Sequence, residues 1–314
     1  PGCYGHNGAD DAALDAAIAA TLLPGTPIRI LWSREDEFGH APVGTAMQVG
    51  LEAVLDDAGF PADLTTTIHS GVHVNRGPGR LLAARLLPGA PPLPAPVESS
   101  DPYPGNGTRN VVPYYDVPQT RYLHHLVAAT PIRTSALRGL GGVVNVFALE
   151  CFLDELAALG GHDPVAYRLA MLRDRRARWL VERAAAMAGW SSRGPAGTGI
   201  GLGLGFARYK NRSGYACVVA QVEADTEIRL RHIWCTADAG LAINPNGVKA
   251  QLEGGIIQAA SMALKEQVAV DENGNATRSW ADYPVLRFSD IPPIDIELAD
   301  QPDEPPLGMG ECTM

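Results

Sequence analysis

The 314-residue sequence lacks any closely spaced pair of cysteines. Its five cysteines form no Cys-x-x-Cys element and stand at positions 3, 151, 217, 235 and 312. Zinc, iron–sulfur and c-type haem sites are built from such pairs, so the chain gives them no support. The scattered, odd set indicates free thiols in a reducing compartment. Cys151 and Cys217 lie in apolar runs, where we expect core residues.

Three further features are missing. No apolar run approaches the roughly 20 residues of a membrane-spanning helix, and no secretion signal is visible. No Gly-x-x-x-x-Gly-Lys-Ser/Thr loop is present, which argues against a generic nucleotide-binding α/β protein. The net charge is −10, and the one basic cluster, within 168–178, is predicted to be a solvated helix face. A nucleic-acid partner is therefore not expected.

What is present is a mixture of helical and strand patterns, with 46% hydrophobic residues, ample for a large core. The patterns predict helices over 9–22, 143–159, from 163 onward, 174–188 and 246–264. They predict strands over 27–32, 46–56, 62–74, 206–222, 226–236 and 293–299. Arg34-Glu35-Asp36-Glu37 is then expected to be a surface patch at a strand end. The predicted fold class is α/β (α+β), with mixed sheets and packed helices.

Residues 87–119 are dense in proline and glycine, which is typical of a long connecting segment. We therefore expect a first domain over 1–95, a connecting segment over 96–130 and a second domain over 131–314. The sequence opens on Pro1 rather than Met and stops just after its most suggestive motif. We expect it to be a piece of a longer polypeptide.

Two glycine-rich loops each precede a predicted helix. In Gly2-Cys3-Tyr4-Gly5-His6-Asn7-Gly8, backbone N–H groups would face an anion or oxo group. A simple tight turn before a helix is an alternative of equal weight. Leu137-Arg138-Gly139-Leu140-Gly141-Gly142 leads into the helix at 143. Arg138 there suits bidentate pairing with a carboxylate, the alternative being a surface arginine at a helix end.

Two more motifs lie near the end of the sequence. Asn244-Pro245 opens a helix that carries Gln251-Leu252-Glu253-Gly254-Gly255, following Asp238-Ala239-Gly240. Adjacent glycines cost about 1 kcal/mol each inside a helix, so we expect another backbone or a ring to pack against them. The amide of Gln251 offers two donors and an acceptor to a ligand, an ordinary polar helix residue being the alternative. Gly308-Met309-Gly310-Glu311 places a carboxylate where a base would be useful, the alternative being a surface carboxylate.

Together these motifs resemble the molybdopterin-binding large subunit of the xanthine dehydrogenase and aldehyde oxidase family, nearest to its nicotinate dehydrogenase-like branch. The region 238–255 is the most specific match, and the resemblance runs from residue 2 to residue 311. It implies molybdenum-hydroxylase cofactor-binding domains and a molybdopterin cytosine dinucleotide cofactor. The molybdenum is held by the pterin dithiolene, so no protein side chain is expected as a metal ligand. The residues implied at the cofactor are Gly5, His6, Arg138, Gly139, Gln251 and Gly310.

The resemblance also implies a reaction, the oxidative hydroxylation of an electron-poor carbon with oxygen from water. Glu311 is the implied general base, because burial beside an apolar substrate suits a carboxylate to this role. Tyr4 and Arg138 are the implied substrate contacts. A nicotinate-like N-heteroaromatic is the implied substrate, with an aldehyde as the first alternative and a non-catalytic fragment or assembly module as the second. Arg34-Glu35-Asp36-Glu37 matches a recurrent family element whose implied role is structural.

The implied partner is a small subunit with two [2Fe–2S] clusters, with a cytochrome or flavoprotein as a candidate for the next electron acceptor. Localisation stays open between the bacterial cytoplasm and a membrane association. Some residues depart from the family pattern, since Cys3 replaces a glycine and Cys312-Thr313 follows the glutamate. The Gly-Gln-Gly and Ser-rich cofactor loops are absent and are expected upstream of Pro1. Four histidines are predicted not to bind metal: His69, His73, His124 and His125.

Overall fold

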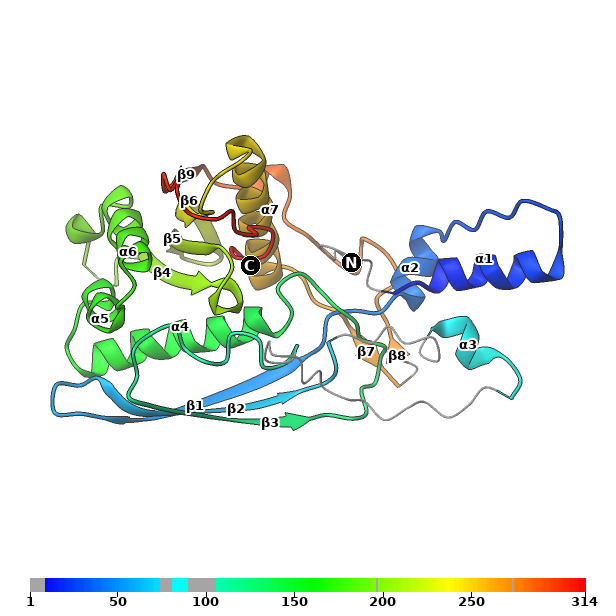
Figure 1. Cartoon of the computed structure of the whole chain (residues 1–314), viewed down its shortest axis with the longest axis horizontal. Coiled ribbons are helices and arrows are strands. Elements are labelled where there is room, and N and C mark those ends of the chain that lie inside the picture. Colours follow the sequence, from blue (N-terminus) through cyan, green and yellow to red (C-terminus); the bar gives the residue numbers. More distant parts are fainter. Residues whose placement is uncertain (1–8, 74–80, 90–105, 196, 273) are drawn as a thin grey trace.

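The computed structural model describes residues 9–73, 81–89, 106–195, 197–272 and 274–314. Its first layer is a three-stranded sheet in the order β1-β2-β3, which lies along the lower edge of Figure 1. β1 and β2 are antiparallel, and β2 and β3 are parallel. The strands are β1 (Met47–Leu55), β2 (Pro61–Ser70) and β3 (Gln119–Leu126).

Helix α4 (Gly141–Leu159) runs across one face of this sheet (Figure 1). Successive strand residues point to opposite faces, so alternate residues of β2 are buried, among them Leu64 and Ile68. Leu64 joins Leu149 and Leu153 of α4 in one core cluster. Apolar burial between sheet and helix thus holds the first layer to α4.

A four-stranded sheet in the order β4-β5-β6-β9 forms the second half, with its last pair parallel and the others antiparallel. Opposite faces of β5 serve two cores: Cys217 faces the cluster with α4 and α6, and Ala216 faces the cluster with α7. The sheet is therefore covered on both faces. The elements are α5 (Pro164–Met171), α6 (Arg175–Met187), β4 (Ile200–Arg208), β5 (Tyr215–Ala224), β6 (Ile228–Asp238), α7 (Pro245–Leu264) and β9 (Ile294–Leu298).

Smaller elements extend to the right of the two sheets in Figure 1: α1 (Asp11–Leu22), α2 (Arg34–His40), α3 (Leu82–Leu86), β7 (Val270–Asp271) and β8 (Gly274–Asn275). Arg133 donates to Asp11 at the start of α1 over 2.9 Å, and Asn275 donates to the Phe38 carbonyl of α2 over 2.7 Å. Short 3-10 turns lie at Trp190–Ser192, Tyr209–Asn211 and Phe288–Asp290. Among the described helices, none has the length and apolar content needed to cross a bilayer.

The predicted fold class, mixed α/β with mixed sheets and packed helices, is confirmed. The helices predicted over 9–22, 143–159 and 246–264 are α1, α4 and α7, each within two residues of its predicted ends. Asp163 caps α5 as predicted, accepting from the backbone N–H groups of Val165 and Ala166. Strong periodicity and cap residues are local signals, which is why these elements were predictable.

Two predicted strands are wrong. Residues 27–32 have no regular structure, and the following charged residues form α2, because Ser33 and Asp36 make a capping box there. The strand predicted over 206–222 is broken by the turn after Arg208, and β4 begins earlier, at Ile200 in the glycine-rich run. Cys151 is exposed on α4 rather than in the core, whereas Cys217 is buried.

Strand β3 was missed and lies within the predicted connecting segment over 96–130. Its buried and exposed residues hardly alternate, so the two-residue repeat that marks a half-buried strand is missing from its sequence. The domain boundaries 1–95, 96–130 and 131–314 stay a prediction. One core cluster joins Leu64 to residues of α4 and α6 across them.

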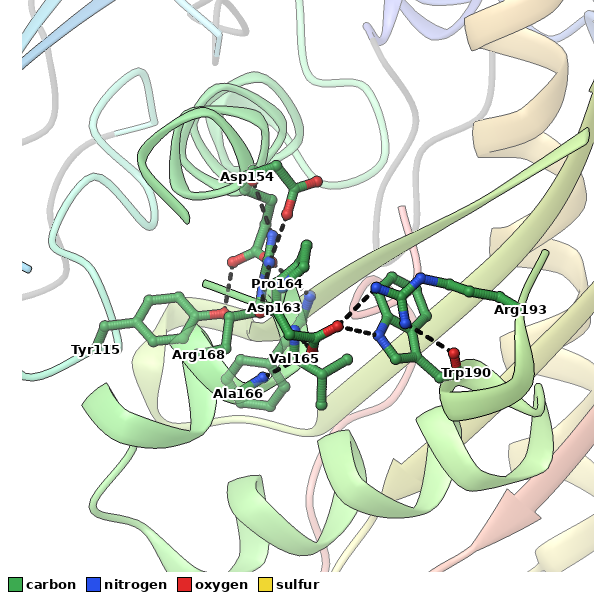
Figure 2. A network of polar contacts seen from close by, with 11 residues as sticks. Tyr115, Asp154, Asp163, Pro164, Val165, Ala166, Arg168, Trp190 and Arg193 are labelled. Carbon is green, nitrogen blue, oxygen red and sulfur yellow. Dashed lines mark hydrogen bonds and ion pairs between the residues drawn. The ribbon is translucent and has the colours of Figure 1, made fainter. Parts of the chain in front are cut away.

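A buried ion pair links α4 to α5 beneath the second sheet. Arg168 is 0% exposed and donates to the Glu150 carboxylate over 2.8 Å and to Asp154 over 2.6 Å. Tyr115 donates to the other Glu150 oxygen over 2.7 Å. Figure 2 shows Arg168 between Tyr115 and Asp154, beside the Asp163 cap with Trp190 and Arg193. The buried charge of Arg168 is thus both paired with a carboxylate and hydrogen-bonded, which offsets the cost of removing it from water.

We expect Arg168→Met to lower the free energy of unfolding by about 3–5 kcal/mol, because it leaves the Glu150 carboxylate buried without its cation. Urea unfolding followed by circular dichroism measures this loss. The matched control is Arg173→Met, which removes an arginine whose side chain is 82% exposed and pairs with Asp116. That change should cost about 1 kcal/mol or less. Equal losses in the two variants would contradict the assigned role of the buried pair.

Candidate functional site

Arg138 joins three segments that are far apart in the sequence. It lies just before α4 and is 1% exposed. Its Nε donates to the Gly310 carbonyl over 2.6 Å, and its Nη2 donates to the Gln251 carbonyl of α7 over 3.0 Å. Its Nη1 donates to Oε1 of Gln258, also on α7, over 3.3 Å. The guanidinium therefore holds the C-terminal segment and α7 against the start of α4.

Glycines permit these close approaches. A Cβ on Gly255 of α7 would lie 2.1 Å from Oγ1 of Thr313, which donates to the Leu252 carbonyl over 3.2 Å. A Cβ on Gly141 would lie 2.4 Å from the Asn106 carbonyl oxygen. No side chain fits at either distance. The prediction that another backbone or a ring packs against the paired glycines of α7 is wrong at Gly255, because the nearest groups there are the side chains of Thr313 and Arg138.

The carboxylate of Glu311 lies at the N-terminus of α4. Its Oε1 accepts the backbone N–H of Gly139 over 3.0 Å. The side chain is partly buried, and Leu140, the N-cap of α4, has a positive φ of 52°. The positive end of the helix dipole favours an anion at this position. The loop at Arg138 and the loop at Glu311 therefore lie side by side.

Tyr209 is a second neighbour of Glu311. Its hydroxyl accepts from Nη1 of Arg109 over 2.8 Å, and Tyr209 lines the same small cavity as Glu311. Burial, and after it the charge of Glu311, raises the pKa of Tyr209 well above its usual range. A phenol that keeps its proton can donate a hydrogen bond to a carboxylate. Glu311 is thus held by the Gly139 N–H, with the protonated Tyr209 beside it.

The turn that carries Tyr209 is strained and clamped. Lys210 and Asn211 have φ values of 58° and 55°, in the left-handed region that residues other than glycine rarely adopt. The Asn110 side chain holds this turn: its Nδ2 donates to the Arg208 carbonyl, and its Oδ1 accepts from the Lys210 N–H, each over 2.8 Å. Asn110 itself has a φ of 59°. Strain of this type gathers at functional sites and persists because surrounding contacts impose it.

Lys210 extends over the ring of Tyr209, with Nζ 5.3 Å from the ring centroid. The side chain is partly buried beside Arg109 and Glu311. Burial, and after it the charge of Arg109, lowers the pKa of Lys210, while the charge of Glu311 opposes this shift. Arg109 and Lys210 therefore form a pair of cations next to the carboxylate.

The predicted site residues divide into three groups. Tyr4, Gly5 and His6 lie outside the described residues. Arg138, Gly139, Gly310 and Glu311 come together as described above. Gln251 contributes its carbonyl to Arg138, while its side chain is exposed. The cofactor-contact roles of these residues stay predictions.

The predicted contact between Arg138 and a substrate carboxylate also stays a prediction, but the arginine uses its guanidinium on Gly310, Gln251 and Gln258. Tyr209 and Arg109 were missed by sequence reasoning. Neither stands in a recognisable motif, and 100 residues separate them. No local pattern of the sequence could have paired them.

Within the described ranges, no three His, Cys, Asp or Glu side chains are grouped as metal ligands. His69 and His125 stack with ring centroids 4.6 Å apart on paired positions of β2 and β3. His124 shares a 2.9 Å hydrogen bond with the Ser70 hydroxyl, and His73 is 3% exposed.

Comparison with known proteins gives two family matches. Residues 94–172 and 191–292 each match a molybdopterin cofactor-binding domain. A nicotinate dehydrogenase subunit of Pseudomonas putida is 35% identical over 330 aligned residues, covering 99% of this chain and 26% of the relative. The beta subunit of isoquinoline 1-oxidoreductase of Brevundimonas diminuta is 32% identical, with 99% and 38% coverage. The chain thus spans about a quarter to two fifths of these relatives.

The fold has a close counterpart among solved structures. Quinoline 2-oxidoreductase from Pseudomonas putida 86 superimposes with a TM-score of 0.73 at 14% sequence identity. The superposition covers 96% of this chain and 61% of that chain. At this identity the likeness is one of fold alone.

Proposed function

We propose that this chain, which belongs to the molybdopterin-binding large subunits of the xanthine dehydrogenase and aldehyde oxidase family, carries the base of a molybdenum hydroxylase active site. The observation that supports this most is the position of Glu311, held by the Gly139 N–H at the start of α4 and beside Tyr209. A partly buried carboxylate beside a directed donor, where three separate segments meet, is typical of a built catalytic site.

The polar groups of this region fit a molybdopterin. Gln251 is exposed on α7, and its backbone carbonyl accepts from Arg138. Gly308 is exposed, and a Cβ there would meet no atom within 4 Å, so the C-terminal segment leaves space for a ligand. Gln251, Gly139 and Gly310 are the residues of this region that we propose to hold the cofactor, in its cytosine dinucleotide form. When bound, the cofactor takes up the two electrons that the substrate loses.

The chain's own residues would accept the proton that the water-derived oxygen loses. Glu311 is proposed to accept it from the water-derived oxygen as this oxygen attacks the substrate carbon. The Gly139 N–H holds the carboxylate in place, so that it need not reorganise. Arg138 holds Gly310, the residue before the base, and so sets where the base lies. Arg138 is in this scheme a positioning residue.

The proposed substrate class is an N-heteroaromatic compound, since the names of two relatives refer to nicotinate and isoquinoline. An aldehyde substrate is the alternative within the same family. Both relatives are named as subunits, which supports a partner; we propose a small [2Fe–2S] subunit that takes the electrons onward.

The test uses the full-length gene product purified with its partner subunit. Elemental analysis should find about one molybdenum per large subunit. Turnover of an N-heteroaromatic in H₂¹⁸O should place ¹⁸O in the hydroxylated product. Absence of molybdenum from the intact complex would instead support a non-catalytic module. Product oxygen derived from O₂ would contradict the proposed reaction.

A further inference from the structure

We propose that Lys210 and Arg109 form an anion site that recognises a carboxylate on the substrate, next to the base Glu311. The inference rests on the proposed function and names a feature of its substrate class, a negatively charged ring substituent. It assigns substrate recognition to the turn after β4 rather than to Arg138.

The two cations have no acidic partner in the part of the chain that the structure describes. Many arginines there form ion pairs with acidic side chains, but neither Lys210 nor Arg109 is among the paired cations. In addition, Nε of Arg109 is buried without a hydrogen-bond partner among the described residues. In a chain of net charge −10, two adjacent cations left unpaired indicate a ligand anion.

Glu311 does not neutralise this pair. Its carboxylate lies near enough to act on the charge of Lys210, but it accepts the Gly139 N–H. Arg109 donates instead to the Tyr209 hydroxyl, through Nη1 over 2.8 Å, and to the Asn106 side chain. The positive charge therefore remains available at the edge of the site.

The backbone holds the two cations together at a cost. Like charges repel, and Arg109 lowers the pKa of Lys210 in addition to the effect of burial. The positive φ of Lys210 adds strain, which the Asn110 clamp maintains. A bound carboxylate would offset the repulsion, with Lys210 as a point charge and Arg109 as a directed donor. Held there, the anion would orient a ring beside Glu311.

Arg138 is a poorer candidate for this role. It is 1% exposed, and its three named hydrogen bonds go to protein oxygens. Lys210, by contrast, is only partly buried, and its ammonium contacts the ring of Tyr209 rather than an acceptor. An incoming anion would meet Lys210 without first breaking a protein hydrogen bond.

The test measures binding rather than turnover, in the full-length protein with its partner subunit. Isothermal calorimetry gives the Kd of nicotinate and of nicotinamide, which has the same ring with a neutral amide. We expect wild type to prefer nicotinate, and Lys210→Met to reduce this preference at least tenfold, the scale of one hydrogen bond to a charged group. Lys210→Arg should restore part of it. The matched control is Lys249→Met, which removes the same charge from an exposed position on α7.

Three results would overturn the anion site. Wild type has no preference for nicotinate, or Lys210→Met leaves the preference unchanged, or Lys249→Met reduces it equally. Circular dichroism of each variant checks that the fold is kept, and the affinity ratio cancels any uniform loss of binding-competent protein. A complex without molybdenum or without turnover would contradict the proposed function. The ratio of the Kd values for nicotinate and nicotinamide tests the anion site separately.

Discussion

Glu311→Gln is expected to lower kcat by about 10²–10⁴-fold, the range that general-base catalysis contributes. The amide has nearly the shape of the carboxylate and can still accept the Gly139 N–H, so the local packing should remain. It cannot take up a proton at the working pH. Steady-state turnover of the full-length complex measures the loss, with molybdenum content determined on the same sample.

The matched control for this variant is Glu253→Gln on α7. Glu253 is also a glutamate within a glycine-containing motif, but it is exposed and has no contact with the Arg138 loop among those described. Its replacement should leave kcat within about twofold, as is usual for a surface change of little energetic effect. Retained turnover in Glu311→Gln with full metal content would show that the base lies elsewhere.

Arg138→Met is expected to have the second-largest effect. It removes the donor to three oxygens, of Gly310, Gln251 and Gln258, and each lost hydrogen bond to a charged group costs about 1.5–3 kcal/mol. The C-terminal segment should loosen, and a displacement of the base by about 1 Å can cost roughly 10²-fold in rate. Hydrogen exchange of residues 307–314 should increase, and kcat should fall with little change in KM.

The kinetic pattern of Arg138→Met separates two roles. A positioning residue changes kcat for charged and neutral substrates alike. A residue that binds a substrate carboxylate raises KM for charged substrates alone, which is the role the sequence first implied. Arg229→Met serves as the control, because Arg229 is an exposed arginine that pairs with the exposed Glu227. Unchanged exchange of residues 307–314 would contradict the assigned positioning role.

Part of the site was predictable because its signals are short and local. Gly139, Gly310 and Glu311 stand in glycine-rich motifs, and Asn244 followed by proline marks the start of α7. For Arg138, the position was predictable from the sequence, but the hydrogen-bond partners were not. Its place in the site follows from its motif, but its partners come from residues more than 100 positions away.

The sequence alone determined the fold class, most helices and the family of the chain, because caps, periodicity and motif spacing are contained in short stretches. Tertiary structure alone decided that β3 completes the first sheet, that Arg109 binds Tyr209 beside Glu311, and that Lys210 lies over the Tyr209 ring. These contacts depend on packing between distant segments. No single segment contains a pattern that specifies its distant partner, so folding has to bring the two together before the contact can be seen.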